Sequence, residues 1–160
     1  MRQHGVTLIQ MMLALGLVGV LTQLAIPAYV NLSDDLHQAS VARELAQALR
    51  AARSQAMLHQ QEVQVVQLQE NWGAGWQVMM AQAVLLERHF ERPLRIAANA
   101  SHIRFSGQGV PRQGNGSFLG ATLEVCNRPE GAGPLRVVLA PSGRVSLRTD
   151  MAGKPLCAGR

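Results

Sequence analysis

The sequence lacks the features that mark an enzyme or a metalloprotein. It contains no G-x-S-x-G segment, and the segment Gly114-x-Gly116 has Leu119 where a dinucleotide-binding loop needs glycine. The five histidines are scattered, and neither cysteine has a histidine or another cysteine within four residues. Zinc sites need ligands at short spacing. We therefore expect no catalysis, no cofactor and no metal.

Charge is also absent from one long segment. Between Val6 and Ser33 there is no Asp, Glu, Lys or Arg, and residues 6–30 are largely apolar. As a helix, these 25 residues would be about 37 Å long, at ~1.5 Å per residue. About 20 apolar residues cross a bilayer core, so the segment predicts a membrane span.

The flanking charges predict an orientation for this span. Arg2 and His4 precede it, and Asp34 and Asp35 follow it. This bias favours a single pass through a membrane, with the N-terminus in the cytoplasm and the C-terminal part on the outer side. A secretory signal has a shorter apolar core and a cleavage site that Ala25–Ala28 fits poorly. A buried core helix is the other alternative, which a run apolar on every face disfavours.

Lysine is almost missing, and the charges are unevenly distributed. Of the fifteen basic residues only Lys154 is a lysine. Residues 31–87 carry three arginines against six acidic residues, a net charge of −3, whereas residues 88–160 carry eleven basic residues against four acidic ones, a net charge of +7. An arginine-rich half favours anionic partners such as nucleic acid. General solvation of the surface explains the charge equally well.

Cysteine is scarce, and both cysteines follow the expected span. An oxidising compartment favours a disulfide between Cys126 and Cys157. Thirty residues lie between them, and closing such a loop stabilises a fold by about 3–4 kcal/mol. Two free thiols are the alternative.

The periodicity of the sequence predicts an α+β protein. A long helix over about residues 6–60 has an amphipathic second half, whose narrow stripe is rich in alanine and leaves Arg50 and Arg53 on the polar side. Alternating segments then predict strands at 62–68, 84–90, 101–105, 118–126, 135–140 and 144–148, and a turn followed by a strand in 71–80. Residues 107–117 predict a loop. We expect the helix to pack on an antiparallel sheet.

The N-terminal segment resembles the type IV pilin-like proteins. Gly5 is followed by V-T-L-I-Q, and the apolar run ends in A-I-P-A-Y at residues 25–29. The rest of the chain is similar to the FimT/FimU minor pilins and the H-type pseudopilins of type II secretion. The similar segments are Trp72-Gly-Ala-Gly-Trp76, Ile103-Arg-Phe105 with a following glycine, Cys126, and Pro141-Ser-Gly-Arg144.

This resemblance implies a processed, assembled protein and no enzyme. A prepilin peptidase would remove the leader, residues 1–5, by cutting after Gly5, and the new amine on Val6 would be methylated. Residues 6–30 would be the transmembrane and fibre-core helix, and residues 31–160 a periplasmic or extracellular α+β domain. The expected function is assembly of a type IV pilus, by priming it or at its tip, together with other minor pilins and the major pilin. A pseudopilin of a type II secretion system is an alternative.

Two residues of the apolar segment bear on assembly. Family members carry Glu at the fifth position after the cut, where this chain has Gln10. Gln10 can donate and accept hydrogen bonds but offers no charge to a neighbour's amine. This fits a subunit used in few copies, while drift to a residue that inserts more readily is the simpler explanation. Pro27 gives the helix a place to kink or soften.

The resemblance also suggests DNA binding for uptake. The FimT branch binds DNA through a G-R-x-R motif, and here Gly143 and Arg144 match while Ser146 replaces the second arginine. In a strand, Arg144 and Arg148 would share one face about 13 Å apart. Other basic residues that would extend the patch are Arg136, Lys154 and Arg160. A solvated face around a tight turn is the alternative. Trp72 and Trp76 could stack on bases, but we expect them to pack in the core or the turn.

Overall fold

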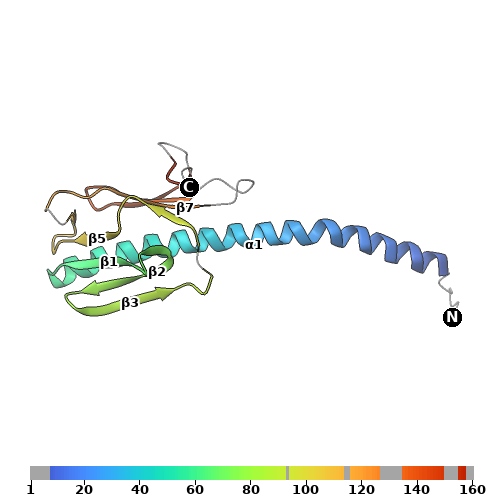
Figure 1. Ribbon diagram of the computed structural model, residues 1–160, viewed down its shortest axis with the longest axis horizontal. Helices are drawn as coiled ribbons and strands as arrows, with labels where there is room; N and C mark the ends of the chain where they lie inside the picture. Colours follow the sequence, from blue (N-terminus) through green and yellow to red (C-terminus); the bar gives the residue numbers. More distant parts are fainter. Residues whose placement is uncertain (1–7, 93, 114–115, 127–134, 150–154, 158–160) are drawn as a thin grey trace, which may run out of the picture. The chain divides into compact units, whose positions relative to one another are not determined.

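The computed structural model describes residues 8–92, 94–113, 116–126, 135–149 and 155–157 (Figure 1). These residues form one helix followed by nine strands. The elements are α1 (Leu8–His59), β1 (Val63–Leu68), β2 (Asn71–Met80), β3 (Ala83–His89), β4 (Ile96–Ala98), β5 (His102–Phe105), β6 (Pro111–Arg112), β7 (Ala121–Val125), β8 (Leu135–Leu139) and β9 (Val145–Arg148).

The chain divides into two units, Met1–Leu36 and His37–Arg160. The described part of the first unit is the N-terminal part of α1. The backbone of α1 is helical without interruption from Leu8 to His59, which confirms the long helix predicted over about residues 6–60. By length and composition this helix can cross a membrane.

The second unit contains the rest of α1 and two antiparallel sheets. One sheet has the strand order β3-β2-β1-β5-β6 and the other β4-β7-β8-β9. Figure 1 shows β7 along one side of the helix and β2 and β3 along the other. The architecture is the predicted α+β one, with the sheet divided in two.

Helix and sheets share one hydrophobic core. The helix contributes small side chains, such as Ala42, Ala52 and Ala56, which let the strands approach closely. The five-stranded sheet contributes side chains such as Val65 and Ile103, and the four-stranded sheet contributes, among others, Leu123, Val137 and Leu139.

Three short segments differ from the sequence prediction. The strand β4 was not predicted, since three residues are too few to show alternation. The two-residue β6 lies inside the predicted loop 107–117 and begins at Pro111, a residue suited to an edge strand. No turn precedes a strand in 71–80, because all ten residues form β2.

The glycines of β2 explain this last difference. A Cβ on Gly73 would lie 1.6 Å from the Leu94 carbonyl oxygen, and one on Gly75 would lie 1.9 Å from that of Arg88. The glycines therefore allow close backbone approach within a strand and do not form a turn. Trp72 and Trp76 flank them and are buried, as expected.

Candidate functional site

Some of the candidate site residues lie within the described part of the chain and others do not. Gly5 and Val6, the expected processing positions, lie outside the described residues, as do Lys154 and Arg160. Gln10 lies in the first turn of α1, and the helical backbone passes through Pro27. The remaining candidates, Cys126, Arg136, Arg144, Arg148 and Cys157, belong to the second unit.

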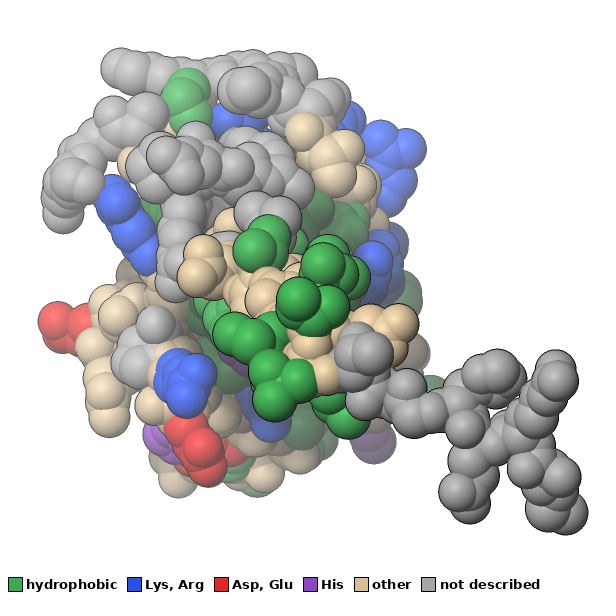
Figure 2. Space-filling view, turned by 90° about the vertical axis from the view of Figure 1, so that its right-hand side faces the viewer, with side chains coloured by type: hydrophobic (Ala, Val, Ile, Leu, Met, Phe, Trp, Pro, Cys, Tyr) green, Lys and Arg blue, Asp and Glu red, His purple; other side chains and the backbone are tan. Residues whose placement is uncertain are grey.

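The first unit exposes an apolar helix surface. Fifteen large hydrophobic side chains between Leu8 and Leu36 are each at least 45% exposed. Figure 2, which faces the N-terminal end of the helix, shows hydrophobic side chains gathered there. Burying one such side chain contributes about 1.5–3 kcal/mol, so leaving all of them in water forgoes on the order of 20 kcal/mol. The surface therefore needs an apolar environment outside the described chain.

A tight hairpin positions Arg144. The Arg144 carbonyl accepts a hydrogen bond from Ala140 N at 2.9 Å, and Gly143 N donates to the Ala140 carbonyl at 2.8 Å. Gly143 has φ +81°, where glycine is favoured. Its missing Cβ would lie 2.6 Å from the Gly109 carbonyl oxygen. The turn therefore requires this glycine, and it leaves Arg144 exposed at the start of β9.

Two arginines of α1 converge on the same turn. The Arg53 guanidinium donates to the carbonyls of Gly109, at 3.0 Å, and Ser142, at 3.4 Å. The Arg50 guanidinium donates to the Val145 carbonyl at 3.2 Å. The helical periodicity predicted both arginines on the polar side of the helix and gave no sign of their role at the turn. Their spacing of three residues, which puts them on one helix face, is the signal that links them.

Arg148 and Arg136 have different surroundings. The two are direct cross-strand partners on β9 and β8, and Glu124 on β7 is the next partner of Arg136. Arg148 is exposed, but Arg136 is 4% exposed and its Nε lies 2.9 Å from the Glu124 carboxylate. Arg136 is thus committed to a buried ion pair and does not belong to an exposed basic patch, contrary to the sequence expectation.

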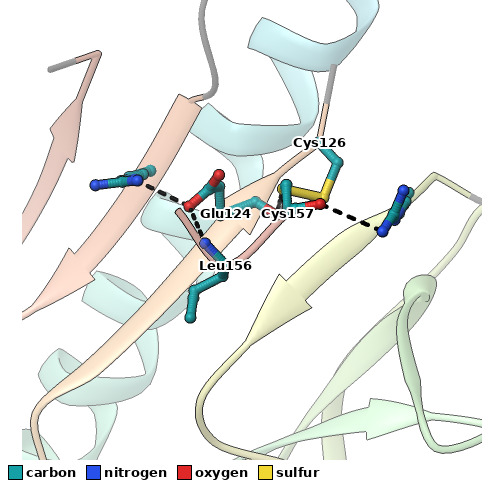
Figure 3. Close-up of a disulfide and its surroundings, with 6 residues drawn as sticks. Glu124, Cys126, Leu156 and Cys157 are labelled. Atoms are coloured by element: carbon teal, nitrogen blue, oxygen red, sulfur yellow. Dashed lines mark hydrogen bonds and ion pairs between the residues drawn. A yellow bond between two sulfur atoms is a disulfide. The ribbon is translucent and has the colours of Figure 1, made fainter. Parts of the chain in front are cut away.

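A disulfide holds the C-terminal segment over this ion pair. Cys126 and Cys157 are joined, which confirms the predicted pairing (Figure 3). The amide of Leu156 donates to the Glu124 carboxylate at 3.0 Å, and the Arg95 guanidinium donates to the Cys157 carbonyl at 3.3 Å. Residues 156–157 therefore cover Glu124 on the face of the four-stranded sheet that points away from α1.

The described residues show no group of three or more His, Cys, Asp or Glu side chains that could hold a metal ion. The contacts of the candidate site are hydrogen bonds to carbonyl oxygens, the buried ion pair and the disulfide. Such an arrangement can position exposed guanidinium groups for anions.

An apolar, exposed helix segment that continues into a helix packed between antiparallel sheets, with a disulfide-fixed C-terminal segment, is the arrangement of a pilin-like fold. Residues 41–143 match the family described as "Type II transport protein GspH". The chain belongs to this family.

Two solved structures have a fold similar to that of this chain. The type IV minor pilin FimU of Pseudomonas aeruginosa, strain PAO1, is similar in two crystal forms. The form in space group P21 has a TM-score of 0.61 and 18% identity and covers 78% of this chain and 98% of the FimU chain. The form in P65 has a TM-score of 0.56 and 19% identity and covers 74% and 98%. No curated protein matches the sequence.

Proposed function

We propose that this protein is an inner-membrane minor pilin that takes part in the assembly of a type IV pilus, by priming the fibre or at its tip. The observation that carries the proposal is the exposed apolar surface of α1 between Leu8 and Leu36. A helix satisfies its own backbone hydrogen bonds in lipid and among neighbouring helices alike. The same surface can therefore serve first as a single-pass anchor and then in a fibre core.

Processing at the N-terminus is part of this proposal. A prepilin peptidase cuts after Gly5, and the amine of Val6 is methylated, so residues 6–30 enter the fibre core while residues 31–160 form the outer domain. Intact mass measurement of the protein from its source cells tests this step. We expect a chain that begins at methylated Val6, and an uncut chain for Gly5→Val. A mature chain that begins at any other residue would contradict the proposal.

A charge scan of the helix tests the anchor. An arginine at the centre of a span opposes insertion by about 2.5–3.5 kcal/mol. We expect Leu17→Arg to remove the protein from both the membrane and the fibre fractions. Leu36→Arg is the matched control, because Leu36 follows the acids at the end of the apolar run. If the two variants were found in the membrane fraction in equal amounts, the proposal that this helix is a membrane anchor would be refuted.

Gln10 tests how the subunit enters the fibre. If the protein is needed in few copies, a missing charge pair with a neighbour's amine is tolerated. Restoring the carboxylate with Gln10→Glu is then expected to leave the number of pili unchanged. A clear loss of pili in this variant would count against the proposal.

The alternative filament is the pseudopilus of a type II secretion system, which the family match favours. Deleting the gene separates the two filaments. Loss of surface pili with intact protein secretion supports the pilus, and loss of secretion with intact pili supports the pseudopilus. Partner subunits, among them the major pilin, are expected to crosslink to α1 in whichever filament is affected.

The second candidate function is binding of duplex DNA for uptake. It is favoured by the β8–β9 turn, where Arg50 and Arg53 bind backbone carbonyls on both sides of exposed Arg144. Exposed guanidinium groups bind phosphates without regard to sequence, and each phosphate contact makes binding more sensitive to salt. Arg148 extends this arrangement along β9.

A salt titration with the full chain in nonionic detergent tests DNA binding. Removing two phosphate contacts with Arg144→Gln/Arg148→Gln should reduce the slope of log K against log salt by about 2. Arg43→Gln/Arg92→Gln is the matched control, since it removes the same charge from two other exposed positions. Equal slopes for the two double variants would remove this candidate.

A further inference from the structure

The five-stranded sheet carries a row of side chains on the face that points away from α1. In antiparallel sheets, directly opposed residues project from the same face. The register pairs Gln64 with Arg104, Arg104 with Arg112, and Arg112 with Phe118. The neighbouring residues Val65 and Ile103 point into the core, so this row faces outward.

The edge of this row is basic and aromatic. Arg104 and Arg112 oppose each other, with Cβ atoms about 5 Å apart for such a pair, where like charges are unfavourable without a counter-ion. The Arg112 guanidinium lies 5.8 Å from the centre of the Phe118 ring and donates to the Gly116 carbonyl at 3.0 Å. Phe118 is nevertheless 65% exposed. This edge therefore presents an exposed aromatic ring beside a cationic group.

The surface beside the arginines has two grooves. A groove of about 320 Å³ adjoins Arg104, and a second of about 590 Å³ adjoins Arg112. Amides, hydroxyls and a histidine line them: Gln60, Gln64, Gln67, Ser101, His102 and Ser106 among others. Glu70, from the β1–β2 turn, is the acidic residue that lines the first groove. The Arg104 Nε atom is buried with no hydrogen-bond partner among the described residues.

We propose that this row is a binding surface for single-stranded nucleic acid. Its side chains match the three parts of such a strand. Arg104 and Arg112 can bind phosphates, Phe118 can stack on the face of an unpaired base, and the glutamine amides can bind base edges. Single strands expose base faces that a duplex keeps stacked inside, and open antiparallel sheets with basic and aromatic side chains suit them. The surface is distinct from the Arg144 turn and does not depend on pilus assembly.

Fluorescence anisotropy with the full chain in nonionic detergent tests the proposal. The probes are a fluorescent single-stranded oligothymidine and a duplex of the same length, with polyglutamate as a competitor. We expect the single strand to bind more tightly than the duplex and to resist polyglutamate. Equal binding of the two nucleic acids, or displacement by polyglutamate at equal charge, would overturn the proposal in favour of general anion binding or an acidic protein partner.

Variants of Phe118 separate stacking from charge. Phe118→Ala should weaken single-strand binding by about 5- to 150-fold, the range for loss of one stacked base. Phe118→Tyr keeps the ring and should bind like the original protein, whereas Phe118→Leu should resemble the alanine variant. Because Phe118 is exposed, the fluorescence of buried Trp72 and Trp76 should remain unchanged in all three.

Arginine variants locate the site. Arg112→Gln should weaken single-strand binding, and Arg144→Gln/Arg148→Gln should leave the preference for the single strand intact. If Phe118→Ala binds normally, or if the Arg144/Arg148 variant alone abolishes single-strand binding, the outward row is not the site.

Discussion

The buried ion pair between Glu124 and Arg136 offers the sharpest test of how the C-terminal segment stabilises the fold. Glu124 is fully buried and Arg136 is 4% exposed. The Glu124 carboxylate accepts hydrogen bonds from Arg136 Nε at 2.9 Å and from the Leu156 amide at 3.0 Å. Glu124→Gln keeps the shape and an acceptor oxygen for Leu156, but removes the negative charge that lies 2.9 Å from the buried Arg136 Nε. The expected loss is about 3–5 kcal/mol of unfolding free energy.

Urea unfolding of the full chain in nonionic detergent measures this loss. Trp72 and Trp76 report it by fluorescence, because both are buried in the second unit. The control is Glu44→Gln, which breaks the exposed ion pair with Arg88 and should cost at most about 1 kcal/mol. The two substitutions are chemically identical, so the difference between them reports burial.

A double variant refines the reasoning. Glu124→Leu/Arg136→Met removes both charges of the pair, and the Leu156 amide loses its acceptor. We expect this variant to be more stable than Glu124→Gln, because breaking a buried ion pair from one side costs more than replacing both partners by apolar residues. If Glu124→Gln is no less stable than Glu44→Gln, or if the double variant is the less stable of the two, the argument from charge burial is refuted.

Two further predictions use the same unfolding assay, and a third is measured by the yield of folded protein. Replacing Cys126 and Cys157 by serine should lower the free energy of unfolding by about 3–4 kcal/mol. A reducing agent should lower the unfolding free energy of the original protein by the same amount and leave that of the variant unchanged. Gly143 and Gly116 have nearly the same backbone angle, φ +81° and +83°, but only at Gly143 would a new Cβ collide with other atoms. Gly116→Ala should therefore lower the free energy of unfolding by about 1–2 kcal/mol, the cost of the backbone angle alone. Gly143→Ala should lower it by more. Gly75→Ala should give little folded protein, because its Cβ would lie 1.9 Å from the Arg88 carbonyl oxygen, and a normal yield would contradict this reading.

Local patterns in the sequence carry much of the fold. The long helix was predicted at about 6–60 and occupies Leu8–His59, because lack of charge and helical periodicity are read from neighbouring residues alone. Alternation likewise predicted β1, β8 and β9 to within one residue at each end. The cysteine pairing followed from there being two cysteines in an expected oxidising compartment.

Contacts between distant segments could not be read in this way. Arg136 alternates with buried residues of β8 and therefore looked exposed, but Glu124 and the C-terminal segment enclose it. The glycines of β2 looked like a turn, because the backbone that approaches them belongs to residues 88 and 94. Arg50 and Arg53 looked like solvated helix residues, although their partners lie more than fifty residues away in the chain.

The composition of α1 changes where its partners change. Between Val41 and Ala56 the buried positions are mostly alanine, and these small side chains let the sheets reach the helix backbone. Each alanine buries little area, so the apolar area buried here comes largely from strand residues such as Val65 and Leu123. Between Leu8 and Leu36 the side chains are large on every face, a pattern typical of a helix enclosed by lipid or by other helices. A helix surface that packs against the chain's own sheets carries alanines, as the second half of α1 does. The leucines, valines and methionines of the first half instead support packing against a partner outside the chain.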